Sequence, residues 1–110
     1  MEDSAKPATK LAMELRVLQA LCQGTPEGSI GEAARDLLHS YRWQEPLHQV
    51  IYEVALSIPS DLPEMIRSQF PARMTRRGFP DFDIEALFTP HGASKAEIEK
   101  ILRRLGEIPA

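Results

Sequence analysis

Four residues of this chain could bind a metal ion: Cys22, His39, His48 and His91. They form no C-x-x-C or H-x-x-x-H pair, and each falls on a different expected element. Glu45 and His48 do have the Glu-x-x-His spacing of di-iron bundles, but such sites need a second motif and two further carboxylates. We therefore expect no metal and no cofactor. Glu45 should favour the positive end of its helix, and His48 should make a local hydrogen bond or a partner contact.

Catalytic patterns are also missing from the sequence. A nucleophilic cysteine needs a nearby base and an electropositive setting, whereas Cys22 shares an apolar helical stripe with Leu11, Leu15 and Leu18. Gly-rich loops, paired catalytic carboxylates and Ser-His-Asp patterns do not occur, nor does the G-x-x-x-x-G-K-[ST] phosphate loop that ATP hydrolysis would require. We therefore expect a buried structural thiol and a protein that is not an enzyme.

Positive charge gathers in one stretch of an otherwise acidic chain, whose formal net charge is −3. This basic cluster could bind phosphates or an acidic protein surface. It has no interleaved aromatic residues, however, so a solvated charged face is the more ordinary interpretation, and we do not expect nucleic acid as the partner. A small helical protein that binds nucleic acid through this cluster is the alternative. The basic cluster consists of Arg67, Arg73, Arg76 and Arg77.

Length and composition predict one globular domain. The chain has 110 residues, 43% of them hydrophobic and 26% charged, which is ordinary for a protein that buries a single core. A lone cysteine cannot form an internal disulfide, and no run approaches the roughly 20 apolar residues that span a bilayer. Residues 1–10 are polar, without the apolar segment of a signal peptide. We expect a disordered tail over 1–7, a single helical domain over 8–110, and a cytoplasmic location without membrane contact.

Turn residues divide the sequence into about five to six short helices, which predicts an all-α fold, a compact bundle. Pro71 should break or kink the fourth helix. Two S-x-x-E spacings, Ser29 with Glu32 and Ser94 with Glu97, predict capping boxes at helix starts. The expected helices cover 8–23, 29–41, 45–57, a stretch from 60 or 61 to 70, 74–77, 84–88 and 94–105.

The core should form where apolar residues recur at helical spacing. Trp43 precedes the third helix as a large apolar anchor, and Gly106 is expected to cap the last helix at its C-terminal end. The expected core consists of Leu15, Leu18, Leu37, Leu38, Trp43, Val50, Ile51, Val54, Met65, Ile66, Phe70 and the apolar stripe of the last helix.

Two segments carry a resemblance to a known family. Glu14-x-x-Val17-Leu18-x-Ala20-Leu21 and Trp43-x-x-Pro46-x-His48-x-x-Ile51-Tyr52-Glu53 stand in the same order and at the same separation as two motifs of the N-terminal domain of the DnaB-type bacterial replicative helicase. The likeness covers residues 12–56, and Arg76-Arg77-Gly78 is similar to a later K/R-R-G step of that family. The insert over 79–88 does not follow the family pattern.

The resemblance implies a helicase N-terminal-domain-like fold and a stand-alone interaction module. In that family the domain pairs with its copies through a C-terminal helical hairpin and docks the primase, so a helicase, a helicase loader or a primase is the implied protein partner. It also implies a possible homodimer. A linker over 89–93 could let the last helix dock on its own core or on a second copy, and we leave both outcomes open. The candidate partner-binding residues are Arg73, Arg76, Arg77, Ile101, Leu102, Arg103 and Arg104.

Overall fold

The computed structural model of the chain describes residues 9–107 and is all-α. Its elements are α1 (Lys10–Gln23), α2 (Gly31–Leu38), α3 (Pro46–Ser57), α4 (Pro63–Arg76), the short 3-10 helix η1 (Ile84–Phe88) and α5 (Lys95–Glu107). The tail expected over 1–7 lies outside the described residues. Within residues 9–107, no helix is long and apolar enough to cross a membrane.

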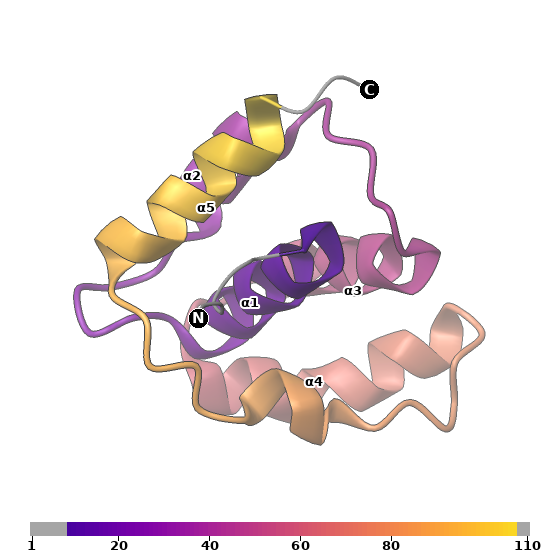
Figure 1. Ribbon diagram of the computed structural model, residues 1–110. Helices are drawn as coiled ribbons and strands as arrows, with labels where there is room; N and C mark the ends of the chain where they lie inside the picture. Colours follow the sequence, from indigo (N-terminus) through magenta and orange to yellow (C-terminus); the bar gives the residue numbers. More distant parts are fainter. Residues whose placement is uncertain (1–8, 108–110) are drawn as a thin grey trace.

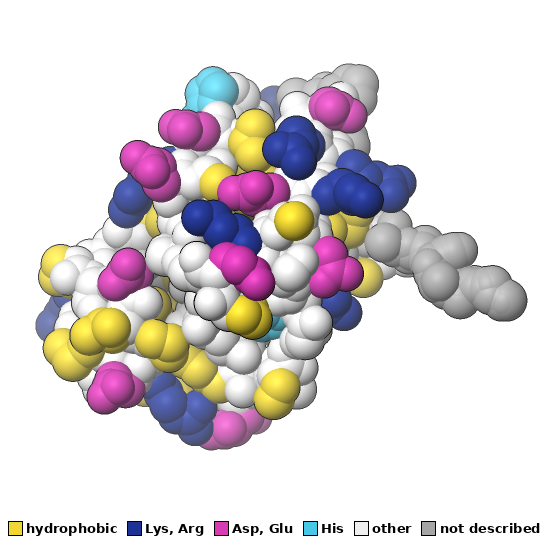
Figure 2. Space-filling model, turned by 90° about the vertical axis from the view of Figure 1, so that its left-hand side faces the viewer, with side chains coloured by type: hydrophobic (Ala, Val, Ile, Leu, Met, Phe, Trp, Pro, Cys, Tyr) yellow, Lys and Arg dark blue, Asp and Glu magenta, His cyan; other side chains and the backbone are white. Residues whose placement is uncertain are grey.

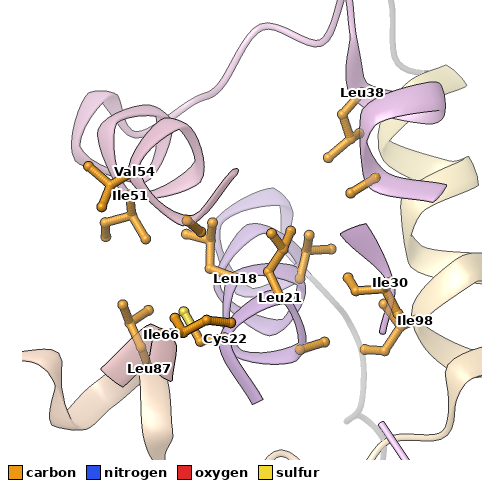
Figure 3. Packing of buried hydrophobic residues seen from close by; sticks show 14 of the residues in the cluster. Leu18, Leu21, Cys22, Ile30, Leu38, Ile51, Val54, Ile66, Leu87 and Ile98 are labelled. Atoms are coloured by element: carbon orange, nitrogen blue, oxygen red, sulfur yellow. The ribbon is translucent and has the colours of Figure 1, made fainter. Parts of the chain in front are cut away.

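Helix α1 lies at the centre of the bundle (Figure 1). On one side α2 and α5 lie next to each other and run in the same direction. On the other side α3, α4 and η1 each pack against α1, and α4 also contacts both α3 and η1. Figure 3 shows Leu21 pointing toward Ile30 and Ile98, while Cys22 points toward Ile66 and Leu87. The expected position of Cys22 in the core is confirmed, because its side chain has no exposed surface.

Two helix starts follow from local sequence. The Thr9 side chain caps α1 by accepting a hydrogen bond from the Ala12 N–H at 3.0 Å. At the start of α5, Ser94 Oγ accepts from the Glu97 N–H at 3.2 Å and Glu97 Oε1 accepts from the Ser94 N–H at 2.8 Å. This reciprocal pair confirms the second predicted capping box.

The first predicted capping box is wrong. Helix α2 begins at Gly31 after Ile30, no side chain caps it, and Ser29 Oγ instead accepts a hydrogen bond from the Gly31 N–H at 3.2 Å. Ile30, the residue before the helix, is 1% exposed, so its side chain belongs to the core. Helix α2 also ends at Leu38, three residues earlier than expected.

Pro71 was expected to break or kink α4, and the structure shows that it does not break the helix. The helix runs without interruption through it, because Ile66, Phe70 and Met74 follow one another at four-residue spacing and are all buried. That burial offsets the backbone hydrogen bond that a proline cannot donate. Met65 lies beside this stripe and is 42% exposed, so its predicted place in the core is wrong.

Most of the remaining core prediction is confirmed. Trp43 is 9% exposed, and Leu18, Leu38, Ile51 and Val54 are buried with it. The remaining expected members, Leu15, Leu37 and Val50, are partly buried and pack against the same cluster.

Gly106 is not a C-terminal cap, because α5 continues through it to Glu107. A Cβ atom at this position would lie 2.7 Å from the backbone oxygen of Leu37 at the end of α2. The glycine therefore permits the close approach of two helix ends.

Candidate functional site

The buried carboxylate of Glu14 is the most unusual chemical group of the described structure. Its residue has no exposed surface and is the one charged member of the buried set among residues 9–107. Buried carboxylates are costly unless hydrogen bonds replace the lost water. The residues around Glu14 therefore form the candidate functional site.

Donors from the end of the α2–α3 loop and from α3 surround this carboxylate. Glu14 Oε2 accepts from the Tyr41 hydroxyl and from the Gln44 N–H at 2.7 Å. Glu14 Oε1 lies 2.8 Å from His48 Nδ1 and 3.4 Å from the Glu45 nitrogen, whose N–H also donates to it. Because a carboxylate only accepts, the His48 ring must carry its proton on Nδ1.

Aromatic rings enclose the same site. The Tyr41 and Trp43 rings meet edge to face with centroids 5.1 Å apart, and Trp43 lies 5.0 Å from the ring of Tyr52. The Lys10 ammonium lies 5.4 Å from the Tyr41 ring centroid, within the reach of a cation–π interaction. These rings limit the access of water to the carboxylate and hold its donors in place.

The electrostatics of the cluster favour an ionised Glu14. Burial by itself raises the pKa of this carboxyl, but the hydrogen bonds from Tyr41, Gln44, His48 and Glu45 outweigh it, and the net pKa lies below the ordinary value of 4.5. Burial and the neighbouring Glu14 charge raise the pKa of the Tyr41 hydroxyl well above its ordinary range. The hydroxyl therefore stays protonated and keeps donating.

The pairing of a carboxylate with an imidazole is the arrangement that orients a catalytic base, so a catalytic role must be considered. None of the three hollows found on the described part of the molecule is lined by Glu14, Tyr41 or His48. What the arrangement does is join α1 to the start of α3.

Sequence reasoning treated the two matched segments as apolar packing and missed Glu14. A pattern in the sequence marked it nevertheless: Glu14 stands three residues before Val17 and four before Leu18, at the spacing of one helical stripe, and both of these residues are buried. A charge at such a position requires partners. Their identity depended on a loop 27 or more residues away.

The basic cluster is largely engaged within the chain. Arg67 pairs with Glu85 at 2.5 Å, and Arg77 pairs with Glu53 at 2.6 Å, which ties α4 to α3. Arg73 donates to the Ser57 hydroxyl at 3.2 Å, and Arg76 is exposed. Three of the four arginines therefore have partners within the chain.

The candidate residues of the last helix have different environments. Leu102 has no exposed surface and packs within the chain's own core, as do Ile98 and Leu105. It is therefore inaccessible while α5 is docked in this way. Ile101 is partly buried, whereas Arg103 and Arg104 are exposed.

The potential metal ligands are not brought together. Among residues 9–107, no group of three or more His, Cys, Asp or Glu side chains could hold a metal ion. Glu45 Oε2 accepts from the Leu47 N–H at 3.0 Å and so caps α3, while His48 turns to Glu14. Burial raises the pKa of the Cys22 thiol to about 12, which disfavours the thiolate.

Comparison with known proteins gives this chain no relative. No protein-family model matches it, and no curated protein or solved structure matches it either.

Proposed function

We propose that the chain is a non-catalytic helical interaction module resembling the N-terminal domain of the DnaB-type replicative helicase. The observation that carries the proposal is the contact of Glu14 with His48. These residues come from the two separate segments that resemble the helicase motifs. Their contact makes the two segments one structural unit, as expected if the segments were inherited together as parts of one domain.

The occupied state of Glu14 supports a non-catalytic role. Its carboxylate accepts four hydrogen bonds from the residues that lead into α3 and from α3 itself, and none of the three hollows described above is lined by Glu14, Tyr41 or His48. The cluster stabilises the domain, and we place the binding of a partner protein on the surface. A protein partner of the replication machinery is the one that the resemblance favours.

The test is direct binding to purified partners. The chain is titrated with the replicative helicase and, separately, with the primase of the source organism, and complexes are followed by sedimentation velocity. We expect one of them to bind with a dissociation constant below about 10 µM, which corresponds to a binding free energy of about −7 kcal/mol. No complex at about 100 µM with either protein would contradict the proposal.

Two surface variants locate the contact. Arg76→Glu changes the exposed end of α4, and the pair Arg103→Glu and Arg104→Glu changes the outer face of α5. Lys100→Glu, on an exposed position of α5, is the matched control for charge reversal. Weakened binding in one set, with the control unchanged, assigns that face to the partner.

Nucleic-acid binding through the basic cluster remains the competing function. Binding of a labelled oligonucleotide that weakens steeply with salt would support it, because phosphate contacts release counterions. Arg67 and Arg77 already pair with glutamates of the chain. We therefore expect no such binding.

A further inference from the structure

A groove of about 500 Å³ opens where the start of α2 faces the connection between α3 and α4. The apolar part of its lining comes from three helices and the loop after α3, with Leu21, Ala55, Ile58 and Ile66 among its members. Its volume falls in the range of about 300–1,000 Å³ that is usual for binding sites. The proposed function assigns no role to this groove.

Two exposed apolar residues are the sequence neighbours of groove residues. Leu62 is 57% exposed and directly follows Asp61, and Met65 is 42% exposed and directly precedes Ile66. Figure 2 shows hydrophobic side chains gathered at the lower left of this side of the molecule, with acidic side chains beside them. An exposed apolar patch beside a hollow is typical of a site that a partner covers.

The mouth of the groove is acidic. Glu32 lines it from α2 and Asp61 from the loop after α3, and Glu64, three residues after Asp61, is exposed on the first turn of α4. Arg35 is the one positive side chain in the groove lining, and its guanidinium donates to the Leu56 oxygen at 3.5 Å. The charges around the opening are therefore complementary to a cationic partner.

We propose that this groove, together with Leu62 and Met65, binds a basic amphipathic helix of a partner protein. Apolar side chains at i, i+3 and i+4 would enter the groove and cover Leu62 and Met65, while Lys or Arg on the flanks would pair with the acidic mouth. The inference rests on the proposed function, because it names the partner chemistry of an interaction module. It does not depend on which protein carries the helix.

The test uses two synthetic 14-residue amphipathic peptides, one with leucines and lysines and the other with glutamate in place of every lysine. Amide chemical shifts of the labelled chain map the binding site, and fluorescence anisotropy gives the affinity. We expect the lysine peptide to shift the amides of residues 29–35 and 58–66. Equal binding of the glutamate peptide, or shifts centred elsewhere, would overturn the proposal.

Variants separate groove binding from general attraction to an acidic protein. The triple change E32Q/D61N/E64Q should weaken the lysine peptide about tenfold, whereas D81N/E99Q/E107Q removes the same charge elsewhere and should leave its affinity within about twofold. The pair L62S/M65S should abolish binding and preserve the thermal midpoint, since both side chains are exposed. Equal effects of the two charge variants would overturn the proposal.

Two further outcomes distinguish the groove from the proposed function. A groove that binds the peptide, in a chain that binds neither helicase nor primase, supports the inference and contradicts the proposed function. Helicase or primase binding that survives both E32Q/D61N/E64Q and L62S/M65S contradicts the inference alone. If the free chain forms a dimer and L62S/M65S converts it to a monomer, the groove binds a second copy of the chain. That result would overturn the proposal.

Discussion

The junction between α1 and the start of α3 is held by a buried charge, whereas the junction that attaches α5 to α1 and α2 is held by apolar burial. At the first, Glu14 accepts four hydrogen bonds. At the second, Ile98, Leu102 and Leu105 are fully buried, and Gly106 lets two helix ends touch. The first junction fixes geometry through directional bonds, and the second gains its stability from area removed from water.

The two histidines at these junctions show the same contrast. His48 Nδ1 donates to the Glu14 carboxylate. His91 Nδ1 instead accepts from the Ala93 N–H at 3.0 Å, so its proton lies on Nε2, which donates to the Gly24 oxygen at 2.9 Å. The His48 ring therefore donates to a charged group, whereas the His91 ring links the end of α1 to the linker before α5.

The largest effect is expected from Leu102→Glu. A glutamate in this fully buried position has no partner for its charge, and the cost is comparable with the about 5–15 kcal/mol that stabilises a whole domain. We expect loss of helicity and of cooperative unfolding by circular dichroism. Ile101→Glu, at the neighbouring partly buried position, should remain folded. A folded monomer with Leu102→Glu would show that the side chain belongs to an interface instead.

Glu14→Ala should destabilise the domain by about 3–5 kcal/mol, because it removes a buried carboxylate and leaves its four partly buried donors without their acceptor. The denaturant midpoint of the variant measures this. The control is Glu53→Ala, which removes a carboxylate from an exposed pair with Arg77 and should cost less than about 1 kcal/mol. Equal midpoints for the two variants would mean that the buried cluster does not hold the α1–α3 junction.

Gly106→Ala should destabilise the domain by about 1–3 kcal/mol, because the added Cβ crowds the Leu37 oxygen. The higher helix propensity of alanine offsets about 1 kcal/mol of this loss. Thermal unfolding measures the change. Gly31→Ala is the matched helical control, since its Cβ would meet Ser29 Oγ at an ordinary 3.6 Å. A stabilising Gly106→Ala would contradict the close approach of α2 and α5.

His91→Ala should lower the free energy of unfolding by about 1–2 kcal/mol, because it removes both hydrogen bonds that the partly buried ring makes. Urea unfolding checks the value against His39→Ala. His39 is exposed, so its removal should change stability by less than about 0.5 kcal/mol. Indistinguishable midpoints for the two variants would remove His91 from the α5 junction.

The smallest effect is the acid dependence of the α1–α3 junction. The pKa of Glu14 is lower in the folded state than its ordinary value of 4.5. Its contribution is therefore fully present above about pH 4.5 and is lost as the pH falls through the lower folded value. Thermal midpoints between pH 7 and pH 3 should fall more steeply for the wild type than for Glu14→Gln. Parallel curves would show that Glu14 is not the acid-sensitive group.

Two identical sequence patterns show how far prediction can go. Ser94 and Glu97 form their capping box because both partners lie within one helical turn and nothing else competes for them. Ser29 and Glu32 have the same spacing, but Ile30 is buried and α2 begins at Gly31, one residue later than a capping box at Ser29 requires. Local patterns hold where burial agrees with them and fail where it does not.

The sequence by itself determined the all-α class, the approximate positions of the helices and most of the core, because caps, breakers and apolar spacing act over one or two turns. Only the tertiary structure decided which side chains found partners. It brought Tyr41 and His48 to Glu14, carried α4 through Pro71, placed Gly106 against α2 and left Met65 exposed. Each of these depends on contacts between residues distant in sequence, whose free energies exceed the local preferences of the chain.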